Sequence, residues 1–193
     1  MPRRIAHSRM FLLFSIVMIA VLLVFAVAVM QSSKPGLTMD VDRPVVPLLL
    51  ASLLVSVATA LIMFAFHFYF CRLVFVDYLQ RSNVTSFRIA LAMMVMFTIH
   101  LLEMQIYGLI MFGLAHGWQV GSLEGFSTGS LADFIYFSIA CYTSLGFGDI
   151  YPTGGLRLFA GLETLSGLLM IGWTTALFIV TLHPIWLESV DRD

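Results

Sequence analysis

The sequence predicts an all-α membrane protein with four transmembrane helices and a shorter re-entrant helix between the third and the fourth. Hydrophobic residues make up 60% of the 193 residues and charged residues only 11%, and the mean hydropathy is +0.98. A water-soluble domain of this length needs more polar surface than that. The apolar residues also gather into four runs, each long enough to cross a bilayer. The net charge of −1 gives no reason to expect a nucleic acid partner.

The four apolar runs define the predicted spans, which are residues 11–30, 45–71, 89–114 and 156–182. The first run has an alternative interpretation as a cleaved signal peptide, because Arg3, Arg4 and Arg9 precede it and Ala26-Val27-Ala28 lies near its end. Its apolar stretch is longer than that of a typical signal peptide, which favours a retained helix.

Positive charge predicts the orientation of these spans. If four helices alternate in direction, one side of the membrane receives seven of the ten Lys and Arg residues, namely Arg3, Arg4, Arg9, Arg72, Arg81, Arg88 and Arg192. The other side receives Lys34, Arg43 and Arg157. Because cytoplasmic loops carry the excess of Lys and Arg, both termini are predicted to be cytoplasmic. Residues 1–88 then form a two-span N-terminal region, and residues 183–193 form a short cytoplasmic tail.

The segment between spans three and four predicts a half-helix at residues 131–143. Ser130 is a favourable N-cap, and Asp133 stands where the acidic residue of a capping box stands. The apolar run that follows is about ten residues long, which is too short to cross a bilayer. A helix of this kind enters the membrane and ends inside it.

The sequence directly after this half-helix, Ser144-Leu145-Gly146-Phe147-Gly148-Asp149, is not typical of a helix. Backbone without helical hydrogen bonds survives at membrane depth only where protein buries it or where it lines a water-filled path. Gly146 and Gly148 suit left-handed backbone conformations. A row of carbonyls turned to one side can replace the hydration shell of a cation, which indicates an ion path.

This hexapeptide resembles the signature of the potassium channel pore family, usually Thr-Val-Gly-Tyr-Gly-Asp. The resemblance covers residues 89–182 as outer helix (89–114), pore helix (131–143), selectivity filter (144–149) and inner helix (156–182). Two further spans before a single pore unit are similar to small prokaryotic members of that family. The resemblance implies passive conduction of K⁺, no catalysed reaction, no cofactor beyond the permeant ion and a homotetramer in a prokaryotic inner membrane, since one chain supplies one of four filter strands.

The resemblance also implies roles for individual residues. The carbonyls of Ser144, Leu145, Gly146 and Phe147, with the Ser144 hydroxyl, would bind K⁺. Gly148 would complete this filter, and Asp149 would close its outer mouth. Apart from the resemblance, we expect support of the filter from residues around the pore helix, namely Thr143, Tyr136, Phe137, Glu103, His100 and Glu163.

Three filter residues differ from the family signature. Ser144 replaces Thr and loses the methyl group that stiffens the rotamer. Leu145 replaces Val and must pack a larger side chain behind the filter. Phe147 replaces Tyr and cannot donate a side-chain hydrogen bond. We expect selectivity to survive, because carbonyls coordinate the ion, although a less rigid filter would favour inactivation or sodium leak.

Two acidic residues lie at membrane depth, Glu103 with His100 in span three and Glu163 in span four. Ionisable residues at such depth are rare and usually face protein or water. A proton-sensitive support for the pore helix is one hypothesis. A structural pair that joins two helices is the alternative, and it is favoured because these positions lie outside the ion path.

Gly167 and Gly172 lie in span four and have two interpretations each. A gating hinge and close helix packing explain Gly167 equally well, whereas packing is favoured for Gly172. His67, among aromatic residues near the inner end of span two, is interpreted as an interfacial residue rather than a ligand.

Three other functions compete with a potassium channel. One is a weakly selective monovalent cation channel of the same fold, and another is a non-conducting structural subunit. The third belongs to a different class, a membrane metal-binding protein or enzyme that uses His100, Glu103 and Glu163. No pairing of a nucleophile with a base supports the enzyme.

Overall fold

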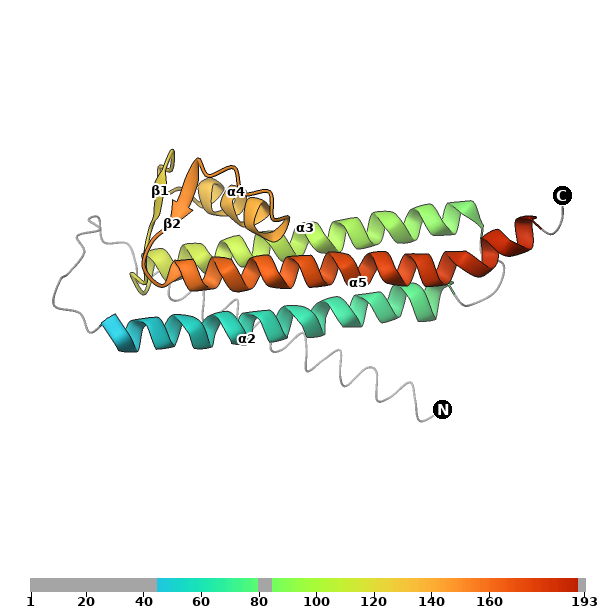
Figure 1. Ribbon diagram of the computed structural model, residues 1–193, viewed down its shortest axis with the longest axis horizontal. Coiled ribbons are helices and arrows are strands. Elements are labelled where there is room, and N and C mark those ends of the chain that lie inside the picture. Colours follow the sequence, from blue (N-terminus) through green and yellow to red (C-terminus); the bar gives the residue numbers. More distant parts are fainter. Residues whose placement is uncertain (1–44, 80–84, 191–193) are drawn as a thin grey trace.

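The computed structural model describes residues 45–79 and 85–190, with side chains described for 49–79 and 85–183. The predicted first span, residues 11–30, lies outside the described residues. Within the described residues, three helices are long and apolar enough to cross a membrane, at Leu49–Leu79, Ser86–His116 and Leu156–His183. These helices run side by side along the long axis of the molecule (Figure 1). These three helices support the interpretation of the chain as a mainly helical membrane protein.

The first described helix, α2, spans Val45–Cys71 and continues as the π-helix η1, Arg72–Leu79. The bounds of α2 coincide with the second predicted span, but Arg72 lies inside the helical continuation rather than in a loop. α2 packs mainly against α5 (Leu156–Val190) and also contacts α3 (Ser86–His116). The second span therefore packs on the rest of its own chain.

The ends of α3 and α5 differ from the predicted spans. α3 begins earlier than residue 89, because the Thr85 side chain caps it by accepting a hydrogen bond from the Arg88 amide at 3.4 Å. α5 runs past residue 182 to Val190, so helix occupies most of the segment expected to be a tail. Hydropathy marks where a helix leaves the apolar part of a membrane, and a helix can continue beyond that point.

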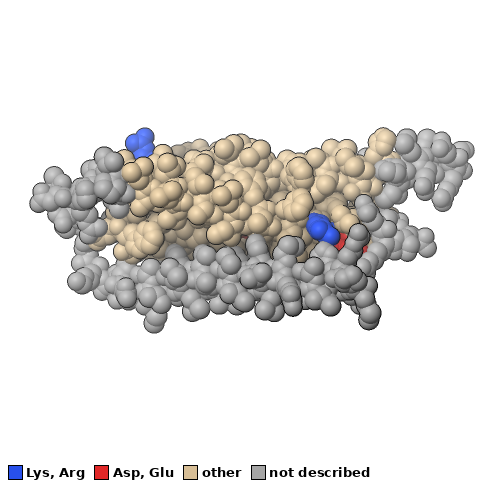
Figure 2. Space-filling view, turned by 90° about the horizontal axis from the view of Figure 1, so that it is seen from below, with Lys and Arg blue, Asp and Glu red and all other residues tan. Residues whose placement is uncertain are grey.

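Charged side chains are scarce on the described surface. Figure 2 shows one face on which the described residues are almost entirely uncharged, with blue atoms near the left end and a group of blue and red atoms to the right of the middle. Glu103 and Glu163, the acidic residues in the middle of the spans, are fully buried. The uncharged part of this face is the surface that lipid would contact.

The short helix α4, Leu131–Tyr142, lies beside one end of the three-helix bundle and packs against α3 and α5 (Figure 1). The core where these helices meet contains large, fully buried side chains, including Tyr107, Tyr142, Phe134 and Phe159. These contacts fix α4 against the long helices.

Two short antiparallel strands join the two sides of the segment that contains α4. β1, Leu123–Gly125, pairs with β2, Ile150–Pro152, and Gly125 lies opposite Ile150. A side chain at Gly125 would place its Cβ 2.1 Å from the Asp149 carbonyl oxygen, and Gly125 has φ +91°. Only glycine permits this close approach. The sequence analysis did not predict these strands, which hold the residues after the candidate filter beside those that precede α4.

Candidate functional site

The first turn of α4 is held by a capping box, as the sequence predicts. The Ser130 hydroxyl accepts a hydrogen bond from the Asp133 amide at 3.3 Å, and the Asp133 carboxylate accepts one from the Ser130 amide at 3.2 Å. The Thr128 hydroxyl and amide also donate to this carboxylate, each at 2.7 Å. These hydrogen bonds, the one from the Thr128 hydroxyl foremost, lower the pKa of the Asp133 carboxyl to about 2.

The last turn of α4 ends in a Schellman motif. The Ser144 amide donates to the Cys141 carbonyl at 2.9 Å, and the Leu145 amide donates to the Ala140 carbonyl at 2.9 Å. Thr143 is the C-cap, and Ser144 has φ +58° in the left-handed position that glycine usually fills. The helix therefore stops at Tyr142, and the chain turns sharply into the candidate filter.

The backbone of the candidate filter alternates between residues with positive φ and residues without it. φ is +58° at Ser144, +51° at Gly146 and +81° at Gly148, whereas Leu145 and Phe147 are not among the positive-φ residues. Such an alternation is compatible with successive carbonyls turned toward the same side of the chain, as in a carbonyl-lined filter. Glycine made the left-handed positions 146 and 148 predictable, but nothing in the sequence marked Ser144, because L-residues rarely adopt this conformation.

The apolar side chains of the candidate filter are largely exposed on the single chain. Leu145 is 56% exposed and Phe147 is 66% exposed. The Tyr136 hydroxyl donates a hydrogen bond to the Asp149 carboxylate at 2.8 Å, which connects α4 to the end of the candidate filter. Phe137 instead packs into the buried core of the chain.

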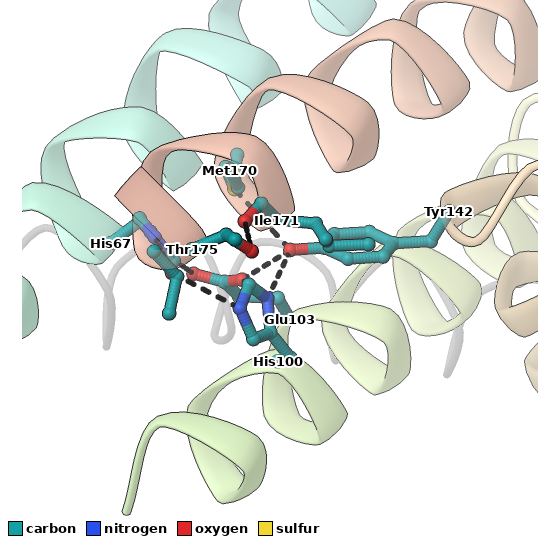
Figure 3. Close-up of polar contacts among 8 residues, drawn as sticks. His67, His100, Glu103, Tyr142, Met170, Ile171 and Thr175 are labelled. Carbon is teal, nitrogen blue, oxygen red and sulfur yellow. Dashed lines mark hydrogen bonds and ion pairs between the residues drawn. The ribbon is translucent and has the colours of Figure 1, made fainter. Parts of the chain in front are cut away.

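Glu103 of α3 lies in a hydrogen-bond network that connects α3 to α2, α4 and α5. Its carboxylate is 3.0 Å from His67 Nδ1 and accepts a hydrogen bond from the Tyr142 hydroxyl at 2.6 Å. His100 Nδ1 is 2.9 Å from the same hydroxyl. The Thr174 hydroxyl lies 2.9 Å from His67 Nε2 and 3.2 Å from His100 Nε2. Figure 3 shows His67, His100, Glu103 and Tyr142 converging on one point.

The structure corrects the interpretation of His67 as an interfacial residue. Its side chain is buried, only 2% exposed, and it bonds to a glutamate 36 residues further along the chain. The aromatic residues beside it in the sequence suggested a membrane interface. A single sequence does not reveal which face of α2 meets α3, so this partnership carried no signal of its own.

Glu163, the second buried acid, contacts α4 by another route. Its Oε1 atom bonds to the Ser138 hydroxyl, which also lies 2.6 Å from the Met104 carbonyl oxygen. A hydroxyl has one hydrogen, so it cannot donate to both oxygens. The geometry is satisfied when the Ser138 hydroxyl donates to the Met104 carbonyl. Glu163 is then the neutral acid and donates its proton to the Ser138 oxygen. Glu103 and Glu163 thus both bond to side chains of α4, the helix that precedes the candidate filter.

Two glycines let the long helices approach α4 closely. A Cβ at Gly108 in α3 would lie 2.9 Å from the Ile135 Cα, and a Cβ at Gly167 in α5 would lie 2.2 Å from the Tyr142 carbonyl oxygen. Gly167 is therefore a packing residue in this structure. Gly172 meets no atom within 4 Å of its added Cβ, so the described part of the chain offers it no close packing partner.

One group of described residues can hold a metal ion, since ligand atoms of His67, His100 and Glu103 lie within 4.8 Å of one another. Glu163, which the sequence analysis grouped with His100 and Glu103, is not part of it. Both nitrogens of each histidine and both oxygens of Glu103 already have hydrogen-bond partners. A metal ion would have to replace these bonds.

The fold and the site define a mainly helical membrane domain in which the short apolar helix α4 and the non-helical segment after it are supported by long helices. Residues 99–183 match a protein family described as "Ion channel". The match begins in α3 and ends in α5, and so includes α4 and the candidate filter. It supports a channel function, and with it a transport protein rather than an enzyme. Comparisons with curated proteins and with solved structures gave no significant match.

Proposed function

We propose that this chain is one subunit of a homotetrameric potassium channel that conducts K⁺ passively across a cell membrane. The observation that carries the proposal is the alternating backbone of the segment from Ser144 to Gly148, placed directly after a capped half-helix. Carbonyls turned to one side form a row of oxygen ligands, and hard monovalent cations prefer oxygen. The carbonyls of Ser144, Leu145, Gly146 and Phe147, together with the Ser144 hydroxyl, would bind the ion.

The exposed filter side chains support the tetramer. Leu145 and Phe147 are large apolar groups, each more than half exposed on the single chain. Apolar groups gathered on one face usually mark a contact with another protein surface. Three further copies around the filter axis would cover them and would bring four carbonyl rows together around one ion path.

The residues behind the filter would keep it in place. Tyr136 would hold Asp149 at the outer mouth through their hydrogen bond, and the Thr143 hydroxyl, bonded to the Ile139 carbonyl at 2.7 Å, would stabilise the end of α4. Phe137 and Glu163 would anchor the middle of α4 to the core. Cytoplasmic termini and a prokaryotic inner membrane remain part of the proposal.

The experiment that tests the proposal is ion flux from liposomes that contain the purified protein. Liposomes loaded with K⁺ and liposomes loaded with Na⁺ are compared, with Ba²⁺ as a pore blocker. Barium-sensitive K⁺ flux that greatly exceeds Na⁺ flux is the expected result. Equal fluxes would instead support the weakly selective channel, and absence of flux from a correctly assembled protein would contradict conduction.

A matched pair of glycine variants connects the flux to the filter backbone. Gly146 (φ +51°) and Gly129 (φ +75°) are both left-handed, and an added Cβ at either position meets nothing within 4 Å. Alanine at either site therefore introduces similar backbone strain, of order 1 kcal/mol. We expect Gly146→Ala to abolish K⁺ flux and Gly129→Ala, in the loop before α4, to retain it. Equal effects of the two substitutions would show that strain alone explains the loss.

A further inference from the structure

The polar groups around Glu103 form a closed ring of five hydrogen-bond contacts, and a longer approach of 3.4 Å between His100 Nδ1 and the Glu103 carboxylate crosses this ring. In order around the ring, the members are Glu103, His67, Thr174, His100 and Tyr142, and the last returns to Glu103. Glu103 and His67 are fully or almost fully buried, as is Tyr142, and Thr174 is 7% exposed. His100 is the one partly exposed member, with 13% of its side chain accessible. The other four members sit inside the protein, where each unpaired polar group would cost about 1–3 kcal/mol.

The hydrogens of these five residues match the ring. In the electroneutral state the carboxyl group, the two imidazoles and the two hydroxyls together hold one exchangeable proton per residue. Five protons for five contacts allow each contact to contain one hydrogen, whether the acidic proton resides on Glu103 or on a histidine. Removal of one hydroxyl takes away both a donor and an acceptor, so it opens two contacts at once.

The ring connects a helix outside the matched pore region to the end of the half-helix before the filter. His67 belongs to α2, whereas the family match starts at residue 99. Tyr142 is the last residue of α4 and lies two positions before Ser144. Its side chain is fixed by the ring, and its carbonyl group packs against Gly167. A displacement of the Tyr142 side chain would therefore be transmitted to the turn that begins the filter.

We propose that this ring, from Glu103 through His67, Thr174, His100 and Tyr142, couples α2 to the filter. His67 and Thr174 are then positioning residues, which act on the filter through Tyr142 without contacting the ion. The functional consequence for conduction rests on the proposed channel function. The coupling of the ring to the conformation of residues 144–148 does not.

The test uses substitutions that keep side-chain shape and remove a hydroxyl. Thr174→Val and Tyr142→Phe each open two ring contacts, and Thr174→Ser restores the hydroxyl. Thr98→Val is the matched control, because the Thr98 hydroxyl is exposed and bonds only to the Met94 carbonyl of its own helix in the described contacts. All variants are prepared as the full chain in lipid nanodiscs.

Nuclear magnetic resonance of protein labelled with ¹⁵N at histidine and glycine gives a readout that does not depend on flux. We expect Thr174→Val to shift the ring-nitrogen signals of both His67 and His100, and also the amide signals of Gly146 and Gly148. Thr174→Ser should return all of these signals toward their wild-type positions. Thr98→Val should leave them unchanged. If Thr174→Val shifts the ring-nitrogen signals of only one of these histidines, or of neither, the proposed hydrogen-bonded ring is refuted.

Flux through liposomes then separates this inference from the proposed function. We expect the ratio of K⁺ to Na⁺ flux to fall about tenfold in Thr174→Val and in Tyr142→Phe, the factor that corresponds to about 1.4 kcal/mol. Because both residues bond to His100, the double variant should lose less than the product of the two single losses. Filter glycine signals that move in a protein without K⁺ flux would refute the channel and support the coupling. Histidine signals that move while the glycine signals and the flux ratio stay constant would refute the coupling.

Discussion

The contact between Gly167 of α5 and Tyr142 of α4 allows a test of whether Gly167 is a packing residue or a hinge. An alanine at this position would place its Cβ 2.2 Å from the Tyr142 carbonyl oxygen and 2.9 Å from both its carbonyl carbon and its Cγ. Two of these atoms belong to backbone, so rotation of a flexible side chain cannot relieve the clash. Overpacking of this kind costs about 1–3 kcal/mol. We expect Gly167→Ala to lower stability by at least that amount.

Gly161→Ala is the matched control on the same helix. An added Cβ at Gly161 meets nothing within 4 Å, so the substitution brings only the helix-forming advantage of alanine, about 0.5–1 kcal/mol. The two variants should therefore shift the apparent Tm in opposite directions, by about 2–4 °C per kcal/mol for a chain of this size. Thermal unfolding of the purified protein in detergent, followed by intrinsic fluorescence, measures both shifts.

A hinge at Gly167 predicts a different result. A residue that serves as a hinge needs backbone freedom and no close neighbour, so alanine would raise the Tm as it does at Gly161 and would change the open probability. If the Tm of Gly167→Ala equals or exceeds that of the wild-type protein, the close packing against Tyr142 is wrong. If the Tm falls and the open probability of the remaining folded protein is unchanged, the hinge is excluded.

Three further predictions concern α4 and the turn that follows it. Because hydrogen bonds from Thr128 lower the pKa of Asp133 to about 2, from about 4 in an unfolded chain, the stability that this carboxylate contributes is complete above pH 4. It is lost as the pH falls from about 4 to about 2, and unfolding of Asp133→Asn should lack this acid-dependent part. Glu163→Gln should unfold close to the wild-type Tm, since an amide can donate to Ser138 as the neutral acid does, whereas Glu163→Leu should lose about 1–3 kcal/mol; equal losses would refute a donating Glu163. Ser144→Gly should raise stability by about 1 kcal/mol by relieving the left-handed backbone, and a fall in Tm would contradict the strain at this residue. Under the proposed function it should also lower K⁺ flux, because it removes the proposed hydroxyl ligand.

Local sequence signals predicted the helical parts of this structure. A long apolar run is sufficient to predict a membrane helix, and α2 begins and ends where its run does. Ser130 and Asp133 are three residues apart, so their capping box depends on nothing outside the first turn of α4. The glycines at 146 and 148 marked left-handed backbone because only glycine adopts it at little cost.

Contacts between distant residues were not predictable from one sequence. The partner of Glu103 on α2 depends on the rotation of that helix about its own axis, and a run that is apolar on every side does not specify this angle. The strands β1 and β2 are three residues each, too short to show an alternating pattern. Ser144 adopts its left-handed conformation because the Schellman motif requires it, against the preference of the residue type.

Apolar side chains on every face of a helix leave its rotation unspecified in lipid as well as in the sequence, and polar residues where these helices meet can specify it. In lipid, an apolar side chain gains little by leaving the acyl chains for another helix, so contacts among Leu and Phe do not strongly fix one rotation or depth. A ring such as that of Glu103, His67 and Tyr142 does fix them, because a shift of α2 by one residue would leave buried donors and acceptors unpaired. The buried acids therefore join α4 to its neighbours: Glu103 of α3 connects Tyr142 of α4 to His67 of α2, and Glu163 of α5 bonds to Ser138 of α4.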